Sequence, residues 1–118
     1  METHELYARA YELAAQGCYS EASHLLDRCL RQDPAHLPAH REMAFVLKMM
    51  GKARDALPHR LEVKRLDPSD LANRYHLAGL YCLLGEKSDA LKEVDELLAL
   101  EPANPKFLAL KNVILGTG

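Results

Sequence analysis

The sequence predicts an all-α fold of three consecutive helix-turn-helix repeats followed by one closing helix. Three residue types recur at intervals of 34 residues along the chain of 118 residues. The recurring positions are Pro34, Pro68 and Pro102, then Gly17, Gly51 and Gly85, then Ala22, Ala56 and Ala90. A fixed period of about 20 to 50 residues is typical of stacked repeat proteins. Because three residue types share one register, the period defines one structural unit that occurs three times.

Each repeat begins with about 14 residues of helical pattern. In the third repeat, Leu77, Leu80, Tyr81 and Leu84 follow the i, i+3, i+4, i+7 spacing of a helix with one apolar face. The glycine that follows is expected to end this helix, since glycine tolerates the left-handed backbone of a helix C-terminus. We therefore expect the first helices of the repeats at residues 2–16, 37–50 and 70–84.

A second helix follows each glycine, and the small alanine near its start allows the two helices to approach closely. This helix ends before the proline, which lacks an N–H and disfavours helical backbone at the preceding residue. The expected spans are 19–32, 53–66 and 87–100. A closing helix at 105–115 has Asn104 as its cap and Pro105 as its first residue. It is expected to cover the apolar face that the third pair leaves exposed.

Composition excludes several classes of function. The formal net charge is −2, and no basic patch suggests nucleic-acid binding. Apolar runs such as Leu97–Leu100 are far too short to span a bilayer, so no membrane insertion is expected. The N-terminus lacks the pattern of a secretory signal, which makes the cytoplasm the expected compartment. Cys18, Cys29 and Cys82 show no CxxC spacing and predict reduced thiols rather than a disulfide framework or a zinc site.

No catalytic residue, metal site or cofactor is expected. His36 and His40 have an i, i+4 spacing, but Pro38 lies between them and no third ligand completes a set. His59 and His76 have no acidic or nucleophilic partner at a fixed spacing. The sequence contains no glycine-rich phosphate-binding loop. The chain is therefore not expected to be an enzyme.

The 34-residue period, the helix-turn-helix unit and the small-residue and proline marks together resemble the tetratricopeptide repeat (TPR) family over residues 3–104. The resemblance implies one domain over residues 1–118, with repeats at about 3–36, 37–70 and 71–104 and a capping helix at about 105–115. His40 and Arg74 depart from the family pattern, which favours a large apolar residue such as Leu6 there. The resemblance also implies a right-handed superhelix whose first helices line a concave groove.

A groove of this kind implies a protein-interaction module, an adaptor or scaffold that binds a peptide or helix of a partner protein. Arg41 and Lys48 are suited to pair with an acidic group of the partner, and aromatic residues are suited to anchor it. The alternative is that some of these side chains only pack between neighbouring helices. The candidate groove residues are Tyr7, Tyr11, Arg41, Glu42, Phe45, Lys48, Met49, Tyr75, His76, Cys82 and Leu83.

Two other functions remain open, a small bacterial-type chaperone for a secreted or assembled subunit and a regulatory TPR segment of a larger enzyme. TPR co-chaperones hold the C-terminal carboxylates of heat-shock chaperones with Lys, Asn and Arg side chains. None of these occupies the matching positions here, which are Tyr7, Tyr11, Glu42, Ala72 and His76. The apolar residues Phe107, Leu108, Leu110, Val113, Ile114 and Leu115 predict a possible homodimer through the C-terminal helix.

Overall fold

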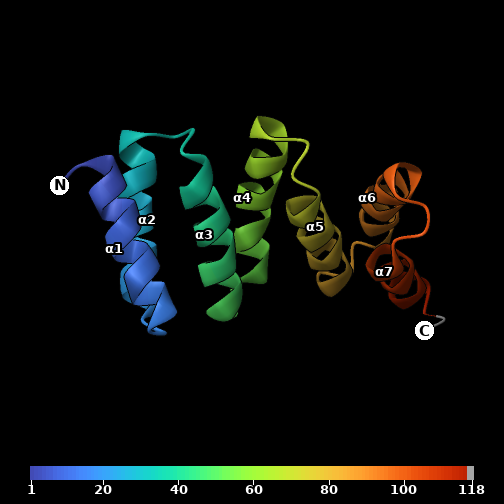
Figure 1. The fold of residues 1–118 in the computed structure, drawn as a ribbon. Coiled ribbons are helices and arrows are strands. Elements are labelled where there is room, and N and C mark those ends of the chain that lie inside the picture. The colour runs from blue at the N-terminus through green and yellow to red at the C-terminus, as the bar shows by residue number, and fades with distance from the viewer. Residues whose placement is uncertain (117–118) are drawn as a thin grey trace. The chain divides into compact units, whose positions relative to one another are not determined.

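The computed structural model describes residues 1–116, and all regular structure in that range is helical. Figure 1 shows the helices following one another along the chain as a series of hairpins. The seven helices are α1 (Thr3–Ala15), α2 (Tyr19–Gln32), α3 (Leu37–Met49), α4 (Ala53–Leu66), α5 (Leu71–Leu83), α6 (Lys87–Leu100) and α7 (Pro105–Leu115). Every boundary lies within one residue of the predicted span, so the all-α repeat prediction is confirmed.

The repeat glycines end the first helix of each pair in the same way. Gly17, Gly51 and Gly85 have φ values of +79°, +76° and +77°. After α1, the backbone N–H of Cys18 donates to the carbonyl of Leu13 at 2.8 Å. This bond across the glycine satisfies a carbonyl that the helix end leaves unpaired. A residue with a Cβ atom is strained at this φ, which explains why glycine recurs at the 34-residue interval.

Contacts divide the chain into two compact units, Met1–Leu66 with α1 to α4 and Asp67–Gly118 with α5 to α7. In the first unit α1 packs on α2, α2 on α3 and α3 on α4. The buried core of this unit consists of Leu6, Ala10, Ala14, Ala22, Leu26, Cys29, Ala39, Met43 and Val46. Burial of each large aliphatic side chain contributes about 1.5–3 kcal/mol to stability.

In the second unit α5 pairs with α6, and α7 packs on both. Its buried core consists of Ala78, Ala90, Val94, Leu97, Phe107 and Ile114. The Asn104 side chain accepts a hydrogen bond from the backbone N–H of Lys106 at 2.9 Å, which confirms the predicted cap of α7. Phe107 and Ile114 are the residues with which α7 covers the third helix pair, so its role as a capping helix is also confirmed.

The two departures from the family pattern have a common physical reason. His40 Nε2 lies 2.7 Å from the carbonyl oxygen of Pro34. In the next repeat, the Arg74 guanidinium donates to the carbonyl oxygen of Pro68 at 3.3 Å. Each polar side chain thus satisfies the backbone of the turn six residues before it. A hydrogen-bonded polar group is tolerated where a buried apolar group is usual.

No helix within residues 1–116 has both the length and the apolar character needed to cross a membrane.

Candidate functional site

Helices α1 and α3 carry most of the predicted groove residues of the first unit. Tyr7 and Tyr11 lie one turn apart in α1, and Phe45 and Met49 lie one turn apart in α3. The exposed fraction is 53% for Tyr11, 42% for Phe45 and 51% for Met49. Large apolar side chains exposed together on neighbouring helices are a feature of binding surfaces, because folding alone gives no reason to leave them in water.

A pocket of about 410 Å³ opens between these helices. It is lined by Tyr11, Ala14, Ala15, Tyr19, Glu42 and Phe45. The ring of Tyr19 meets the ring of Phe45 edge-on, with centroids 6.2 Å apart and planes at 75°. The small side chains of Ala14 and Ala15 leave the space that the aromatic rings enclose. Three predicted residues, Tyr11, Glu42 and Phe45, therefore lie together around one cavity.

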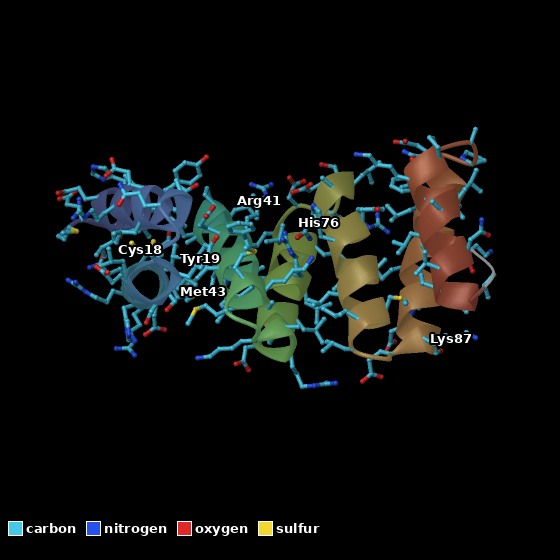
Figure 2. All side chains as sticks on the ribbon, turned by 90° about the horizontal axis from the view of Figure 1, so that it is seen from below. Cys18, Tyr19, Arg41, Met43, His76 and Lys87 are labelled. Atoms are coloured by element: carbon cyan, nitrogen blue, oxygen red, sulfur yellow. The ribbon has the colours of Figure 1, made fainter. Side chains whose placement is uncertain are left out.

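Tyr19 is a pocket residue that sequence reasoning missed. It is the first residue of α2 (Figure 2), and the prediction assigned the groove to the first helix of each repeat only. The signal that was available is its place directly after the Gly17-Cys18 turn. A side chain at that point stands at the mouth of the helix hairpin, where it reaches α3.

Tyr7 lies deeper than Tyr11. Its ring centroid is 6.2 Å from that of Tyr11 and 5.3 Å from the ring of His36. Burial, with a smaller contribution from the Glu42 carboxylate, raises the pKa of Tyr7 above its ordinary value. The phenol is therefore neutral at physiological pH and is available as a hydrogen-bond donor. Its half-buried ring supports the exposed ring of Tyr11.

Glu42 is the acidic residue of the pocket. Its side chain is half-buried, and burial raises the pKa of the carboxyl, while the positive charge of Arg60 acts in the opposite direction. Among residues 1–116, no hydrogen bond or ion pair reaches this carboxylate. A partly buried carboxylate that faces a pocket can accept a hydrogen bond from a ligand that enters it.

The two predicted basic residues differ from each other. Arg41 is half-buried and already takes part in an interaction of its own. Lys48 lies exposed in the last turn of α3. Neither residue lines the pocket, so their proposed pairing with an acidic group of a partner concerns the surface around it.

The remaining candidates lie in α5, in the second unit. The ring of Tyr75 packs against Phe107 of α7, with centroids 5.9 Å apart, and so contributes to the core of this unit. Cys82 is half-buried against the same core. His76 is exposed beside Tyr75, with ring centroids 5.7 Å apart, and Leu83 is 63% exposed. His76 and Leu83 are thus the surface residues of the α5 set, while Tyr75 and Cys82 also serve packing.

A histidine pair joins α3 to α4, although the sequence suggested no partner for His59. The Nδ1 atoms of His40 and His59 lie 3.0 Å apart. Because His40 Nε2 must donate to the Pro34 carbonyl, its Nδ1 accepts, and His59 Nδ1 donates. Burial, assisted by His40, lowers the pKa of His59. The sequence contains no fixed spacing that would mark this contact, because the partner lies on the other helix of the hairpin.

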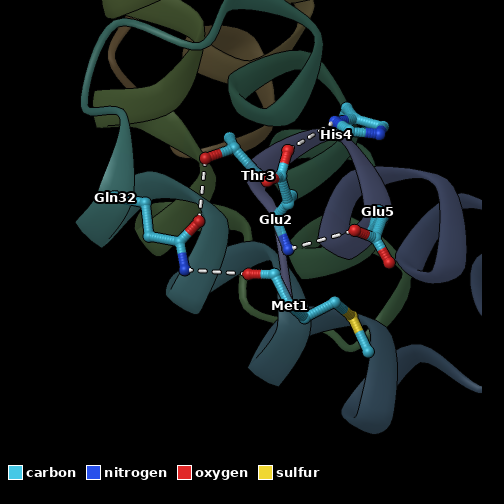
Figure 3. A pocket seen from close by; sticks show the side chains of 6 residues that line it. All are labelled: Met1, Glu2, Thr3, His4, Glu5 and Gln32. Atoms are coloured by element: carbon cyan, nitrogen blue, oxygen red, sulfur yellow. Dashed lines mark hydrogen bonds and ion pairs between the residues drawn. The ribbon is translucent and has the colours of Figure 1, made fainter.

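A second pocket surrounds the N-terminus of α1 (Figure 3). It is lined by Met1, Glu2, Thr3, His4, Glu5 and Gln32. The Thr3 hydroxyl donates to the Gln32 side chain at 2.8 Å, and the Gln32 amide donates to the carbonyl of Met1 at 3.2 Å. These bonds tie the chain start to the end of α2. Glu2, His4 and Glu5 are exposed and close together, but their arrangement is that of a capped helix start.

The buried cysteine, Cys29, lacks the properties of an activated nucleophile. Cys29 is buried, and its Sγ lies 3.6 Å from the carbonyl oxygen of Thr3. Burial raises the pKa of this thiol, and the nearby Asp33 raises it further. A thiol with a raised pKa stays protonated at physiological pH and is a poor nucleophile.

No protein-family model matches the chain. Two curated proteins of Arabidopsis thaliana are similar in sequence. The inactive TPR repeat-containing thioredoxin TTL3 is 30% identical over 90 residues, which are 76% of this chain and 13% of that protein. The TPR repeat-containing thioredoxin TTL4 is 36% identical over 80 residues, which are 67% of this chain and 12% of that protein. The chain thus spans about an eighth of the length of these relatives.

Solved structures share the fold. A structure of MamA has a TM-score of 0.90 at 18% identity and covers 99% of this chain and 66% of its own. The second TPR domain of human RPAP3, solved in complex with an HSP70 peptide, has a TM-score of 0.80 at 20% identity. That match covers 96% of this chain and 98% of the RPAP3 domain. These similarities, together with the observed helix pairs, show the same helical repeat fold.

Proposed function

Because this chain belongs to the tetratricopeptide repeat family, we propose that it is a protein-interaction module that binds a peptide or helix of a partner protein. The observation that carries the proposal is the surface of α1 and α3. There Tyr11, Phe45 and Met49 are exposed around or beside a pocket of about 410 Å³. Aromatic side chains are enriched among the residues that dominate binding energy at interfaces.

The solved structures support this interpretation. The RPAP3 domain, which shares the fold, is in complex with a peptide. Another TPR structure, of YrrB, is described as having an unusual peptide-binding site. In our proposal the chain acts as an adaptor or scaffold, and the α1–α3 surface is the part that contacts the partner. Arg41 and Lys48 of α3 contribute charge to this contact from outside the pocket lining. Within the second unit, His76 and Leu83 are the exposed candidates of α5.

The proposal is tested with peptides displayed on phage. A library of random peptides is selected against the whole chain, and the affinity of the enriched peptides is measured by fluorescence anisotropy. The double variant Tyr11→Ala with Phe45→Ala is expected to bind at least about tenfold more weakly, since each aromatic anchor contributes more than about 1 kcal/mol.

The matched control removes equally exposed apolar surface elsewhere. Leu108 and Val113 of α7 are 44% and 55% exposed, and their change to alanine is expected to leave peptide affinity unchanged. Equal loss in both double variants, or no loss in either, contradicts the assignment of the surface. Circular dichroism of each variant verifies that the helical fold is retained.

A second candidate function is a regulatory segment of a larger enzyme. It is favoured by the two curated relatives, which are named thioredoxins and are about eight times longer than the matched segment. Sequencing the transcript beyond the codon for Gly118 tests this candidate. A stop codon directly after it contradicts the candidate, whereas an open frame encoding an enzyme domain supports it.

A further inference from the structure

The α1–α3 pocket combines a negative charge with aromatic walls. Glu42 lines it together with Tyr11, Tyr19 and Phe45. The carboxylate is half-buried, and within the described residues no donor reaches it. A pocket that holds only apolar side chains gains nothing from a carboxylate among its lining residues, because even partial burial of a charge opposes folding. The charge instead favours a ligand of opposite sign.

The aromatic rings are arranged to accept such a ligand. Tyr11 is 53% exposed and Phe45 is 42% exposed, so a large part of each ring is open to a bound group. Tyr19 supports Phe45 through the edge-on contact, and Tyr7 supports Tyr11. A cation over the face of an aromatic ring is attracted by the ring's negative quadrupole, and the attraction grows as water is excluded. Aromatic rings also pack against the aliphatic stem of a lysine or arginine.

No Lys or Arg is among the residues that line the pocket in the described part of the chain. The positive charge of Arg60 of α4 acts on Glu42 and lowers the pKa of its carboxyl, but Arg60 does not line the pocket. Arg41 of α3 takes part in an interaction of its own and does not line the pocket either. The negative charge is therefore partly balanced at a distance but receives no hydrogen bond. A ligand cation that enters the pocket gains a charge-assisted hydrogen bond that the free protein does not have.

We propose that the α1–α3 pocket receives a lysine or arginine side chain of the partner, with its cationic head on Glu42 and its stem against Tyr11 and Phe45. The occupant is a peptide segment in which a basic residue is flanked by apolar ones. This inference rests on the proposed function, because it names the chemistry of the partner at the same surface. The ligand then carries a basic residue for Glu42 in addition to the acidic group that Arg41 and Lys48 are expected to bind.

The test uses the same random phage library with two targets, the wild-type chain and Glu42→Gln. The glutamine keeps the size of the side chain and removes its charge. Peptides enriched on the wild type are expected to contain Lys or Arg between apolar residues, and selection on Glu42→Gln is expected to lose that preference. A wild-type peptide is expected to bind Glu42→Gln about tenfold to a hundredfold more weakly.

Three controls make the result specific. Glu21→Gln removes the same charge from an exposed position on α2 and is expected to retain wild-type affinity. A peptide with citrulline in place of arginine keeps the shape of the side chain without its charge and is expected to lose affinity as Glu42→Gln does. Phe45→Leu keeps an apolar residue but removes the ring, and is expected to weaken the basic peptide more than the citrulline peptide.

The outcomes separate the two proposals. If enriched peptides depend on Tyr11 and Phe45 but lack basic residues, the cation pocket is wrong while the binding surface stands. The same conclusion follows if Glu42→Gln binds them as tightly as the wild type. If no peptide depends on the α1–α3 surface, both proposals fail together. Thermal unfolding of Glu42→Gln shows whether the variant is folded, and we expect no loss of stability because the buried charge is removed.

Discussion

Acid should destabilise the first unit through the pair formed by His40 and His59. The two Nδ1 atoms lie 3.0 Å apart, and His40 Nε2 is held by the carbonyl of Pro34. This geometry accommodates one shared proton between the rings, but a second proton places two N–H groups against each other. In the unfolded chain both imidazoles take up a proton freely below about pH 6.5. His59 therefore takes up a proton less readily in the folded chain than in the unfolded chain.

The magnitude follows from linkage. The pKa of His59 in the folded chain is lowered, first by burial and then by His40. The contribution of His59 to the free energy of unfolding is therefore complete at pH values above its pKa in the unfolded chain, and it declines as the pH falls below that pKa. Withholding one proton costs about 1.4 kcal/mol for each pH unit below about 6.5, or about 2 kcal/mol at pH 5. Asp27 of α2 and Asp55 of α4 act in the opposite direction on His59. The value of about 2 kcal/mol is therefore an upper figure.

The assay is urea-induced unfolding followed by circular dichroism at about pH 7.5 and about pH 5, within the range where imidazoles titrate. The variant His40→Leu removes the pair and introduces the apolar residue type that the family favours there. Its loss of stability between the two pH values should be smaller than that of the wild type by up to about 1 kcal/mol, because the burial that also lowers the pKa of His59 remains.

The exposed His24 of α2 provides the matched control, because His24→Leu makes the same substitution at a histidine outside the pair. This variant should show the acid sensitivity of the wild type. Equal acid sensitivity in the wild type and His40→Leu would refute the reasoning, because the pair then withholds no proton.

Three further predictions concern the helices and their surfaces. Pro58→Ala should raise the free energy of unfolding by up to about 3 kcal/mol, since Pro58 lies inside α4 and offers no N–H to the carbonyl of Arg54. A urea unfolding curve that shows no gain in this free energy contradicts the prediction. The peptide SGPTIEEVD, which the RPAP3 domain binds, should bind this chain with a dissociation constant above roughly 1 mM, because Glu42 repels the carboxylates of the peptide. A binding isotherm with a micromolar dissociation constant that rises with salt contradicts this prediction. The exposed residues Leu108 and Val113 of α7 should support a homodimer, and Val113→Glu should disrupt it. Sedimentation equilibrium that gives the monomer mass at all concentrations contradicts this prediction.

The helices were predictable because the residues that end them are local in the sequence. Gly17 and its counterparts require left-handed backbone, and the prolines bar the helix from continuing. The grouping of Tyr11 with Phe45 was also within reach, since both follow from the register of first helices. The closing helix could be placed because Asn104 and Pro105 are a recognisable helix start.

Other features depend on how the helices cross one another. The 34-residue register of the sequence carries no information about those crossings. Tyr19 reaches the pocket because the start of α2 lies beside Phe45 of α3. His40 meets His59 across a hairpin, 19 residues along the chain, with no periodic signal to mark the pair. Tyr75 was predicted as a groove residue, but its ring also packs on Phe107, a contact that depends on the position of α7.

The central claim is that the surface of α1 and α3 binds a peptide of a partner protein. The most direct test is to titrate the nitrogen-15-labelled chain with a library-selected peptide and to follow amide chemical shifts by NMR. The account predicts that the largest shifts fall on residues of α1 and α3 around Tyr11, Glu42 and Phe45, with α7 little changed. Shifts confined to α7, or to the outer residues of α2 and α4, would contradict it.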